Sequence, residues 1–452
     1  MAWLDVTKRA GVAGVLALTL CTCKEAPRGP DPVPVKQEGV TYWNRVAGIF
    51  ERHCTSCHAK GGIAPFPLAS FVDAREHIGA IGDATRSKHM PPWLPDTRSC
   101  APLSHARELP TADIDAIDRW IAAGAPEGDP ATHVPTTKAR TYATVSGAAD
   151  WVATPAEPYS PKAARTDDYH CFVLDPKLTT PQKISALRIV PGAPSIVHHV
   201  LLFEVRGAGI PKVEELDARE AGPGYTCFGG IGVAPTLRQG HIEKGELVDF
   251  DAQMIVGWAP GGGATDEPGA PTALPAGTAI HLAPGSRLVM QVHYSLGDNY
   301  RKGMTDATKV EMWSAKDGAR RQGVWVPLLD ASFRVPIGAG PTDPRATAKR
   351  TVDLPLPLRV LGVAPHMHLR GRSIRVEGEG ADGASSCFVD VPRWDFHHQE
   401  AYWLTEAKRT TRATLSCTWD NTKPIGKKPP HELRWGEGTD DEMCLAFLFA
   451  SL

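Results

Sequence analysis

Short runs of alternating residues, separated by glycine and proline turns, dominate the chain from about residue 160 to its end. The run RLVMQVHY at 287–294 places four apolar side chains on one face and Val289, Gln291 and His293 on the other. The 43 Gly and 40 Pro favour many short strands over long helices. A Pro/Gly-rich break at 337–347 divides this part of the chain. We therefore expect a mainly β protein with two β-sandwich domains, over 156–335 and 345–452.

The first 23 residues have the pattern of an export signal. Lys8 and Arg9 precede an apolar run at 11–20 that is too short to cross a bilayer as a mature helix. Cys23 stands three residues after Leu20, as in a bacterial lipoprotein signal, although Thr22 replaces the usual small residue. We expect an exported protein, periplasmic or held at the outer membrane by an N-terminal lipid; signal cleavage without lipidation is the alternative.

Residues 41–130 read as a small helical domain between two linkers, at 24–40 and 131–155. Helical spacing begins at Tyr42 and leads into Cys54, and a second helix is predicted over 111–123. Thr111 is expected to cap that helix and Gly124 to end it.

The motif Cys54-Thr-Ser-Cys57-His58 gives this domain its chemistry. Two thiols at this spacing add to the vinyl groups of a haem, and the adjacent histidine ligates the iron. The alternative is a redox or zinc C-x-x-C beside an unrelated histidine. Export and the preceding amphipathic helix favour one covalently bound haem c.

The second ligand of the haem iron should come from later in the same domain. We expect Met90, in a proline-rich loop, because a thioether raises the reduction potential and suits electron transfer. The alternatives are His77, His89 and His105.

Histidines recur beside apolar strands in the β part of the chain. His366 and His368 are two apart, so in an extended segment both rings project from one face and can share a metal. His198 and His199 are adjacent and can chelate one ion only if the backbone bends, and His293 could complete their site. Imidazole suits copper, zinc, iron and nickel, whereas a thioether such as that of Met443 selects copper.

The order HHV, QVHY, PHMH and WGEGTDDEMC resembles the ascorbate-dependent type 2 copper monooxygenases, the family of peptidylglycine α-hydroxylating monooxygenase and dopamine β-hydroxylase. The resemblance covers about residues 150–452. It implies two tandem jelly-roll β-sandwich domains, each binding one copper, here preceded by a cytochrome c domain that resembles those of bacterial oxidoreductases. The implied ligands of the electron-transfer copper are His198, His199 and His293, and those of the dioxygen-binding copper are His366, His368 and Met443.

The resemblance also implies disulfides and a reaction. Cys171 would pair with Cys227, and Cys417 with Cys444, whereas Cys100 and Cys387 have no counterpart and are either free or paired with each other. The reaction would be hydroxylation of a substrate C–H bond by O2. We expect the haem to pass single electrons from an external reductant to the copper of the first jelly roll.

Two positions depart from the peptide-amidating members of the family. Ala364 stands where an arginine helps to hold the substrate carboxylate, and Phe447 replaces a tyrosine. Peptide amidation is therefore not expected, and the substrate stays an unidentified small organic or peptidic molecule. His397 and His398 match no ligand and are interpreted as residues of a cleft wall or of the surface.

Two other classes of protein compete with this interpretation. One is a copper and haem electron-transfer or copper-binding protein without oxygenase activity. The other is a zinc-dependent carbohydrate-binding or hydrolytic β-sandwich, in which Met443 has no role. The net charge of −2 and the lack of a long basic run give no indication of a nucleic-acid partner.

Overall fold

The structure is a computed structural model. It describes residues 39–55, 57–60, 64–104, 106–135, 145, 147–162, 167–227, 230–233, 251–258, 271–297, 300–316, 321–396, 398–426, 428–436 and 441–451. The predicted export signal with Cys21 and Cys23, most of the first predicted linker, and His105 and His397 lie outside the described residues. Among the described residues, no helix is long and apolar enough to span a bilayer.

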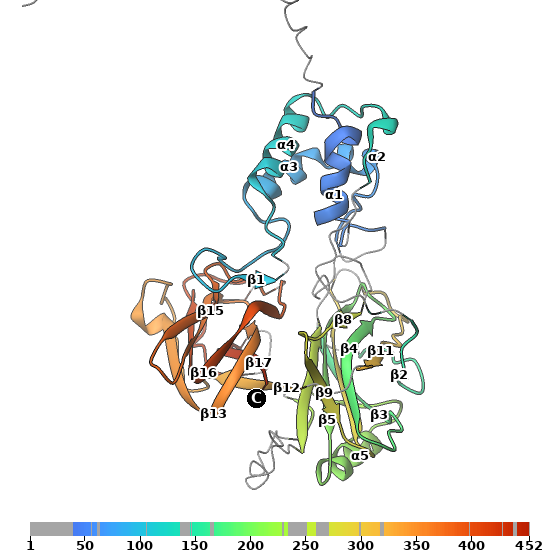
Figure 1. Ribbon diagram of the computed structural model, residues 1–452, viewed down its shortest axis with the longest axis vertical. Coiled ribbons are helices and arrows are strands. Elements are labelled where there is room, and N and C mark those ends of the chain that lie inside the picture. The colour runs from blue at the N-terminus through green and yellow to red at the C-terminus, as the bar shows by residue number, and fades with distance from the viewer. Residues whose placement is uncertain are drawn as a thin grey trace, which may run out of the picture. The chain divides into compact units, whose positions relative to one another are not determined.

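Residues 40–132 form a group of short helices (Figure 1). A π-helical turn continues directly into α1, and α4 covers the segment predicted to be helical. Pro110 rather than Thr111 stands at the N-cap of α4, and Gly124 follows its end with a positive φ of 83°. The apolar core of this group includes Phe50, Ile117 and Trp120. The helices are η1 (Tyr42–Val46), α1 (Ala47–His53), α2 (Phe71–Glu76), α3 (Ile78–Arg86), α4 (Thr111–Ala122) and η2 (Pro130–Thr132).

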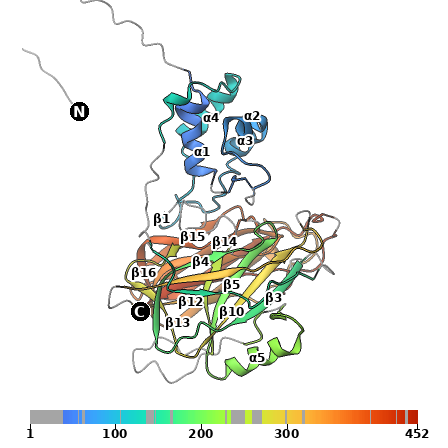
Figure 2. The same ribbon diagram turned by 90° about the vertical axis from the view of Figure 1, so that its right-hand side faces the viewer.

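Strands make up most of the remaining chain, and the prediction of a mainly β-sandwich protein is confirmed. A five-stranded sheet has the order β6-β3-β10-β5-β7. Its strands are β3 (Asp167–Leu174), β5 (Val197–Val205), β6 (Tyr225–Thr226), β7 (Ala252–Trp258) and β10 (Arg287–Ser295). Helix α5 (Gly209–Arg219) lies against β3 (Figure 2).

A larger sheet follows the path β15-β14-β16-β13-β17-β12-β9-β4-β11-β2, with β1 beside β16 and β8 beside β4. Its strands are β1 (Leu103–Ser104), β2 (Trp151–Ala153), β4 (Gln182–Val190), β8 (Thr272–Ala273), β9 (Thr278–Leu282), β11 (Lys309–Ser314), β12 (Arg321–Leu329), β13 (Thr347–His366), β14 (Gly371–Glu379), β15 (Ser385–Val391), β16 (Tyr402–Trp419) and β17 (Leu445–Ser451); η4 (Pro344–Ala346) precedes β13.

Strand β10 shows how the alternating pattern becomes a layered structure. Leu288, Met290 and Val292 enter a core shared with β4, β9 and β11 of the larger sheet. Val289, on the other face, packs with Val213 of α5. Both faces of β10 are covered, one by the core shared with the larger sheet and the other by the cluster that includes α5, and this explains why nearly all of its residues are buried.

Strand β12 joins the first β region, which comprises β2 to β11, to the C-terminal β region, which comprises β13 to β17. It pairs with β17 in antiparallel register from Gly323 to Leu329, and its first two residues pair with β9 in parallel. Strand β2 lies inside the segment expected to be a linker and pairs with β11 as the last strand of the larger sheet. The pairings of β12 with β17 and of β2 with β11 join segments more than 100 residues apart, which no local pattern reveals.

Three disulfides close the β regions. Cys171–Cys227 and Cys417–Cys444 are formed, and so is Cys100–Cys387, which answers the question left open by the sequence. Cys54 and Cys57 are not part of any disulfide.

Candidate metal sites

A β-bulge brings the first three histidines together. On the paired strands β5 and β10, His293 lies opposite His199 and Tyr294 lies opposite Val197, so His198 is the extra residue of the bulge. The bulge turns the His198 ring toward the side that His199 faces. The bend that two adjacent histidines need in order to share one ion is therefore present.

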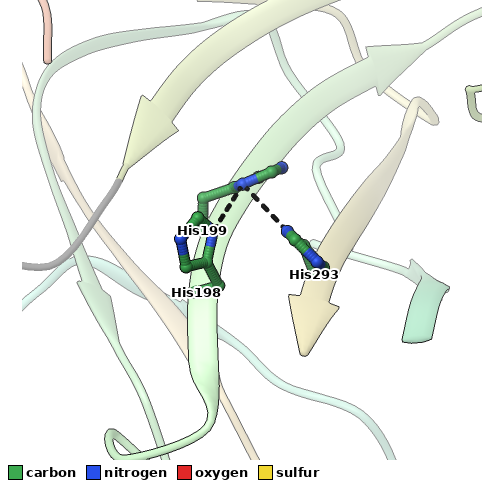
Figure 3. A group of neighbouring side chains, drawn as sticks. All are labelled: His198, His199 and His293. Atoms are coloured by element: carbon green, nitrogen blue, oxygen red, sulfur yellow. Dashed lines mark hydrogen bonds between the residues drawn. The ribbon is translucent and has the colours of Figure 1, made fainter. Parts of the chain in front are cut away.

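The three rings converge from the two neighbouring strands (Figure 3). The Nδ1 atom of His199 is 3.4 Å from that of His198 and 3.3 Å from that of His293. One potential ligand atom from each residue lies within 4.8 Å of the other two. A four-coordinate ion with metal–nitrogen bonds of 2.0–2.1 Å separates its nitrogen ligands by roughly 3.3 Å. The spacing of this three-histidine cluster therefore suits a single metal ion.

Strand β3 fixes the ring of His293. Asp167 Oδ1 is 2.8 Å from His293 Nε2, and the Tyr169 ring stacks on the imidazole at 4.1 Å between centroids. A carboxylate on Nε2 leaves Nδ1 of His293 directed at the other two histidines. Burial, together with the neighbouring histidines, lowers the pKa of His199 well below its usual value, so its ring stays neutral and able to bind a metal.

The second pair, His366 and His368, stands at the end of β13. Their ring centroids are 5.0 Å apart with an interplanar angle of 85°. His366 Nδ1 is 2.6 Å from Gln399 Oε1, and His368 Nδ1 is 3.0 Å from the backbone oxygen of Asp441. Both partners are hydrogen-bond acceptors, so each Nδ1 carries the proton and each Nε2 is the atom available to a metal.

Glu442 joins the His368 segment to the Met443 segment. Its buried carboxylate accepts hydrogen bonds from the backbone N–H groups of His368 and Arg370 and from Trp419 Nε1, at 3.0, 2.6 and 3.0 Å. Burial raises the pKa of Glu442 to about 7, against the lowering effect of these donors. The next residue is the buried Met443, and the disulfide of Cys444 follows. The chain therefore holds Met443 on the segment that runs beside His368.

The two groups of histidines share one neighbour. The Phe396 ring stacks on His198, with centroids 5.5 Å apart, and meets the His368 ring edge-on at 5.9 Å. His366 and His368 also contribute to the lowered pKa of His199. The three-histidine cluster and the His366 pair therefore lie close to each other, with Phe396 between them.

A pH dependence of stability follows from His366. Burial, with His368 next to it, lowers its pKa from 6.5 to about 3. The unfolded chain therefore binds more protons than the folded chain between these values, and stability falls as the pH is lowered through this window. We expect His366 to reduce the unfolding free energy of the metal-free protein by about 2 kcal/mol between pH 7.5 and pH 5. Urea unfolding at both pH values measures this, and His366→Leu should show a smaller loss; an equal loss would contradict the assignment.

In the helical region, His58 follows α1 and is nearly buried. Its Nδ1 is 2.8 Å from the backbone oxygen of Phe66, which leaves Nε2 for another ligand. Burial lowers the pKa of His58, and His77 adds to this effect. The His77 ring stacks on Phe66 at 3.9 Å. Met90 follows α3 and is half-buried, and its backbone N–H donates to the backbone oxygen of Ala84. Of the candidates for the second haem ligand that the structure describes, His77 is the one that shares the Phe66 ring with His58.

Four positioning residues were not found from the sequence: Asp167, Phe396, Gln399 and Glu442. Only Glu442 and Gln399 carried a signal, as neighbours of Met443 and of the HH pair at 397–398. His398, interpreted as a cleft-wall or surface residue, is 2.9 Å from Asp395 through its Nδ1 and has the His89 ring 6.0 Å away.

Comparison of this chain with known proteins gives structural matches at low identity. No known protein family matches it, and no curated protein does. An allantoicase structure matches with 10% identity over 65% of this chain and 82% of its own, at a TM-score of 0.17. Allantoicase from Saccharomyces cerevisiae matches with 8% identity over 65% and 80%, also at 0.17. A fucolectin from striped bass (Morone saxatilis) matches with 11% identity over 62% and 85%, at 0.17. Similarity at this level carries no argument about function.

Proposed function

We propose that this protein is a copper-dependent monooxygenase that hydroxylates a substrate C–H bond with O2. The observation that carries the proposal is the convergence of His198, His199 and His293. A second pair, His366 and His368, lies close to them. The segment of His368 is joined to that of Met443 through Glu442. The order of these motifs resembles the type 2 copper monooxygenases. The two β regions would then be the family's jelly-roll domains.

The residues present fit two copper ions. His198, His199 and His293 would hold one ion through three imidazole nitrogens, with Asp167 orienting His293. His366, His368 and Met443 would hold the other, and the thioether of Met443 favours Cu(I) over zinc. When bound, this second copper would supply the one-electron chemistry that activates O2. The protein's own contribution is to keep His199 and His366 neutral through their lowered pKa values, to direct the free nitrogens of the histidines and to place Phe396 between the two sites.

The helical region fits a c-type haem. Cys54 and Cys57 are not in a disulfide, and His58 presents Nε2 because Phe66 occupies its other nitrogen. The haem would bind covalently to both cysteines, with His58 on the iron and Met90 or His77 as the second ligand. It would accept single electrons from an external reductant. The N-terminal signal pattern supports export and a possible lipid tether at Cys23.

Elemental analysis tests this proposal. The full chain is produced in an export-competent host that assembles c-type haem, and is then reloaded with copper. We expect about two coppers per iron, falling to one in His366→Ala or Met443→Ala protein that stays folded. Oxygen uptake on adding reductant then separates an oxygenase from an electron carrier. Zinc in these sites, or no copper beside an intact haem, would overturn the proposal.

The carboxylate behind His293 should control metal affinity at the first site. Replacing Asp167 with asparagine removes the charge that orients His293 and strengthens it as a ligand, so copper affinity there should fall about 10- to 100-fold. Chelator competition measures this affinity. Asp168→Asn is the matched control, because Asp168 is the next residue of β3 and bonds instead to Tyr159 and Lys162. Equal affinities in the two variants would show that Asp167 does not support the ligand.

A further inference from the structure

Residues 394–402, which follow β15 and reach the first residue of β16, touch three parts of the molecule through the residues described among them. Phe396 lies between His198 and His368. Gln399 bonds to His366. Glu400 forms an ion pair with Arg107, which belongs to the segment between α3 and α4 of the helical region. We call residues 394–402 the junction segment.

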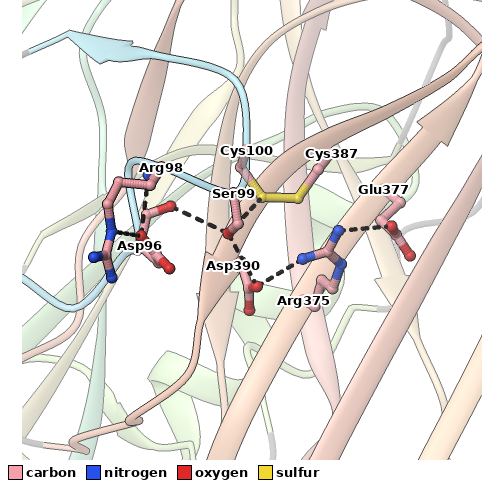
Figure 4. The surroundings of a disulfide bond; sticks show 8 residues. All are labelled: Asp96, Arg98, Ser99, Cys100, Arg375, Glu377, Cys387 and Asp390. Carbon is pink, nitrogen blue, oxygen red and sulfur yellow. Dashed lines mark hydrogen bonds and ion pairs between the residues drawn. A yellow bond between two sulfur atoms is a disulfide. The ribbon is translucent and has the colours of Figure 1, made fainter.

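A strap at residues 93–107 attaches the helical region to the C-terminal β region beside the junction segment. Cys100 is joined to Cys387 of β15, and the backbone N–H groups of Asp96 and Ala101 donate to the backbone oxygens of Asp390 and Cys387 at 2.8 and 2.9 Å. Figure 4 shows this anchorage, with the carboxylate of Asp390 between Ser99 and Arg375. Further along the strap, β1 pairs with the start of β16.

The ion pair between Arg107 and Glu400 ends this strap. The side chains of Arg107 and Glu400 are 28% and 10% exposed, so both are largely removed from water. A charge-assisted bond in such surroundings holds its partners in one geometry, because neither can be left unpaired without a large penalty. Cys57 of the C-x-x-C-H motif is also among the groups near enough to Arg107 to influence its pKa.

Gln399 relates this ion pair to His366. It is the neighbour of Glu400 in the chain, and both ends of its amide are engaged. Its Oε1 lies 2.6 Å from His366 Nδ1, and its Nε2 donates to the backbone oxygen of Phe396 at 2.7 Å. A shift of the backbone at Glu400 would therefore move the acceptor that orients His366.

We propose that the Arg107–Glu400 ion pair positions Gln399 and so sets the metal affinity and geometry of the His366 site from the helical region. Arg107, Glu400 and Gln399 are positioning residues that act through His366. This inference rests on the proposed metal site at His366, His368 and Met443. It adds that the metal affinity of this site depends on the part of the chain that carries the C-x-x-C-H motif.

Copper titration of the full chain tests the inference. In a His293→Ala background, which leaves the His366 site, the Cu(II) dissociation constant is measured by chelator competition and the ligand geometry by the copper hyperfine splitting in EPR. Gln399→Leu should weaken binding about 10- to 100-fold, as the loss of a direct partner does. Arg107→Met, one step further out, should weaken it by about tenfold and change the hyperfine splitting in the same direction.

Arg188→Met is the matched control. Arg188 pairs with Glu311 in β11 at similar exposures of 33% and 8%, but away from the junction segment. The Cu(II) dissociation constant of the Arg188→Met variant should stay within about twofold of that of the His293→Ala background. If Arg107→Met does not fold, Glu400→Gln, which keeps the volume but loses the charge, should give the same weakening. The inference would be overturned if Arg107→Met or Glu400→Gln had the same Cu(II) dissociation constant as the control while Gln399→Leu bound copper more weakly. No copper at the His366 site in the background itself would overturn the proposed function instead.

Discussion

Replacing His58 with alanine should abolish turnover driven by a donor that reduces only the haem, while turnover driven by ascorbate survives. The imidazole of His58 is the expected axial ligand, and its loss changes the potential and access of the haem iron. Ascorbate can reduce copper directly, without a haem, in the family that this chain resembles. We expect haem-driven turnover to fall below about one hundredth of its rate in the starting protein. Ascorbate-driven turnover should stay within about threefold of its rate in the starting protein. Oxygen uptake with each reductant measures both rates.

His133→Ala controls for a general effect on the helical region. His133 lies after η2 and pairs with Glu51 of α1, so its loss perturbs the same helices without touching the proposed haem ligand. It should leave both rates nearly unchanged. An equal loss with both reductants in His58→Ala would mean that the haem supports the structure and does not deliver electrons.

Glu442→Gln should both destabilise the protein and impair the His366 site. The carboxylate of Glu442 accepts from His368, Arg370 and Trp419, and the NH2 group of glutamine would oppose one of these donors. Leaving buried donors unpaired should lower the free energy of unfolding by about 2 kcal/mol. Freed from this anchor, the Met443 segment should no longer hold its place beside His368. Urea unfolding and copper content measure the two effects.

Glu204→Gln separates the two effects. Glu204 is equally buried and accepts from Arg206, Gln253 and the backbone N–H of Ala283, within the first β region. It should destabilise the protein to a similar extent yet leave copper at the His366 site. If both variants lose this copper alike, Glu442 matters only for stability.

Local patterns predicted several elements of the fold well. The helix over 111–123 appears as α4, and the alternation at 287–294 appears as β10 with its apolar face in the core. Both succeed because the periods of 3.6 and 2 residues follow from backbone geometry. The same reasoning placed Thr111 at a cap that Pro110 occupies instead, since several residues before a helix can serve as its boundary.

The candidate site was only partly visible in the sequence. The histidines and Met443 could be selected by their residue type and order, but not the bulge at His198 that turns two adjacent rings to one side. The bulge depends on how β5 pairs with β10. Nor could Asp167, Phe396 or Gln399 be selected, because their role lies in contacts with residues more than 30 positions away.

The sequence by itself determined the C-x-x-C-H spacing, the β character of the chain and the set of residues that we propose as ligands of metal and haem, because these depend on residue type and on neighbours a few positions apart. Only the tertiary structure decided that the rings of His198, His199 and His293 converge. It also decided that Cys100 pairs with Cys387 and that Arg107 forms an ion pair with Glu400. Strand register and long-range packing set these contacts, and both are properties of segments that are distant in the chain.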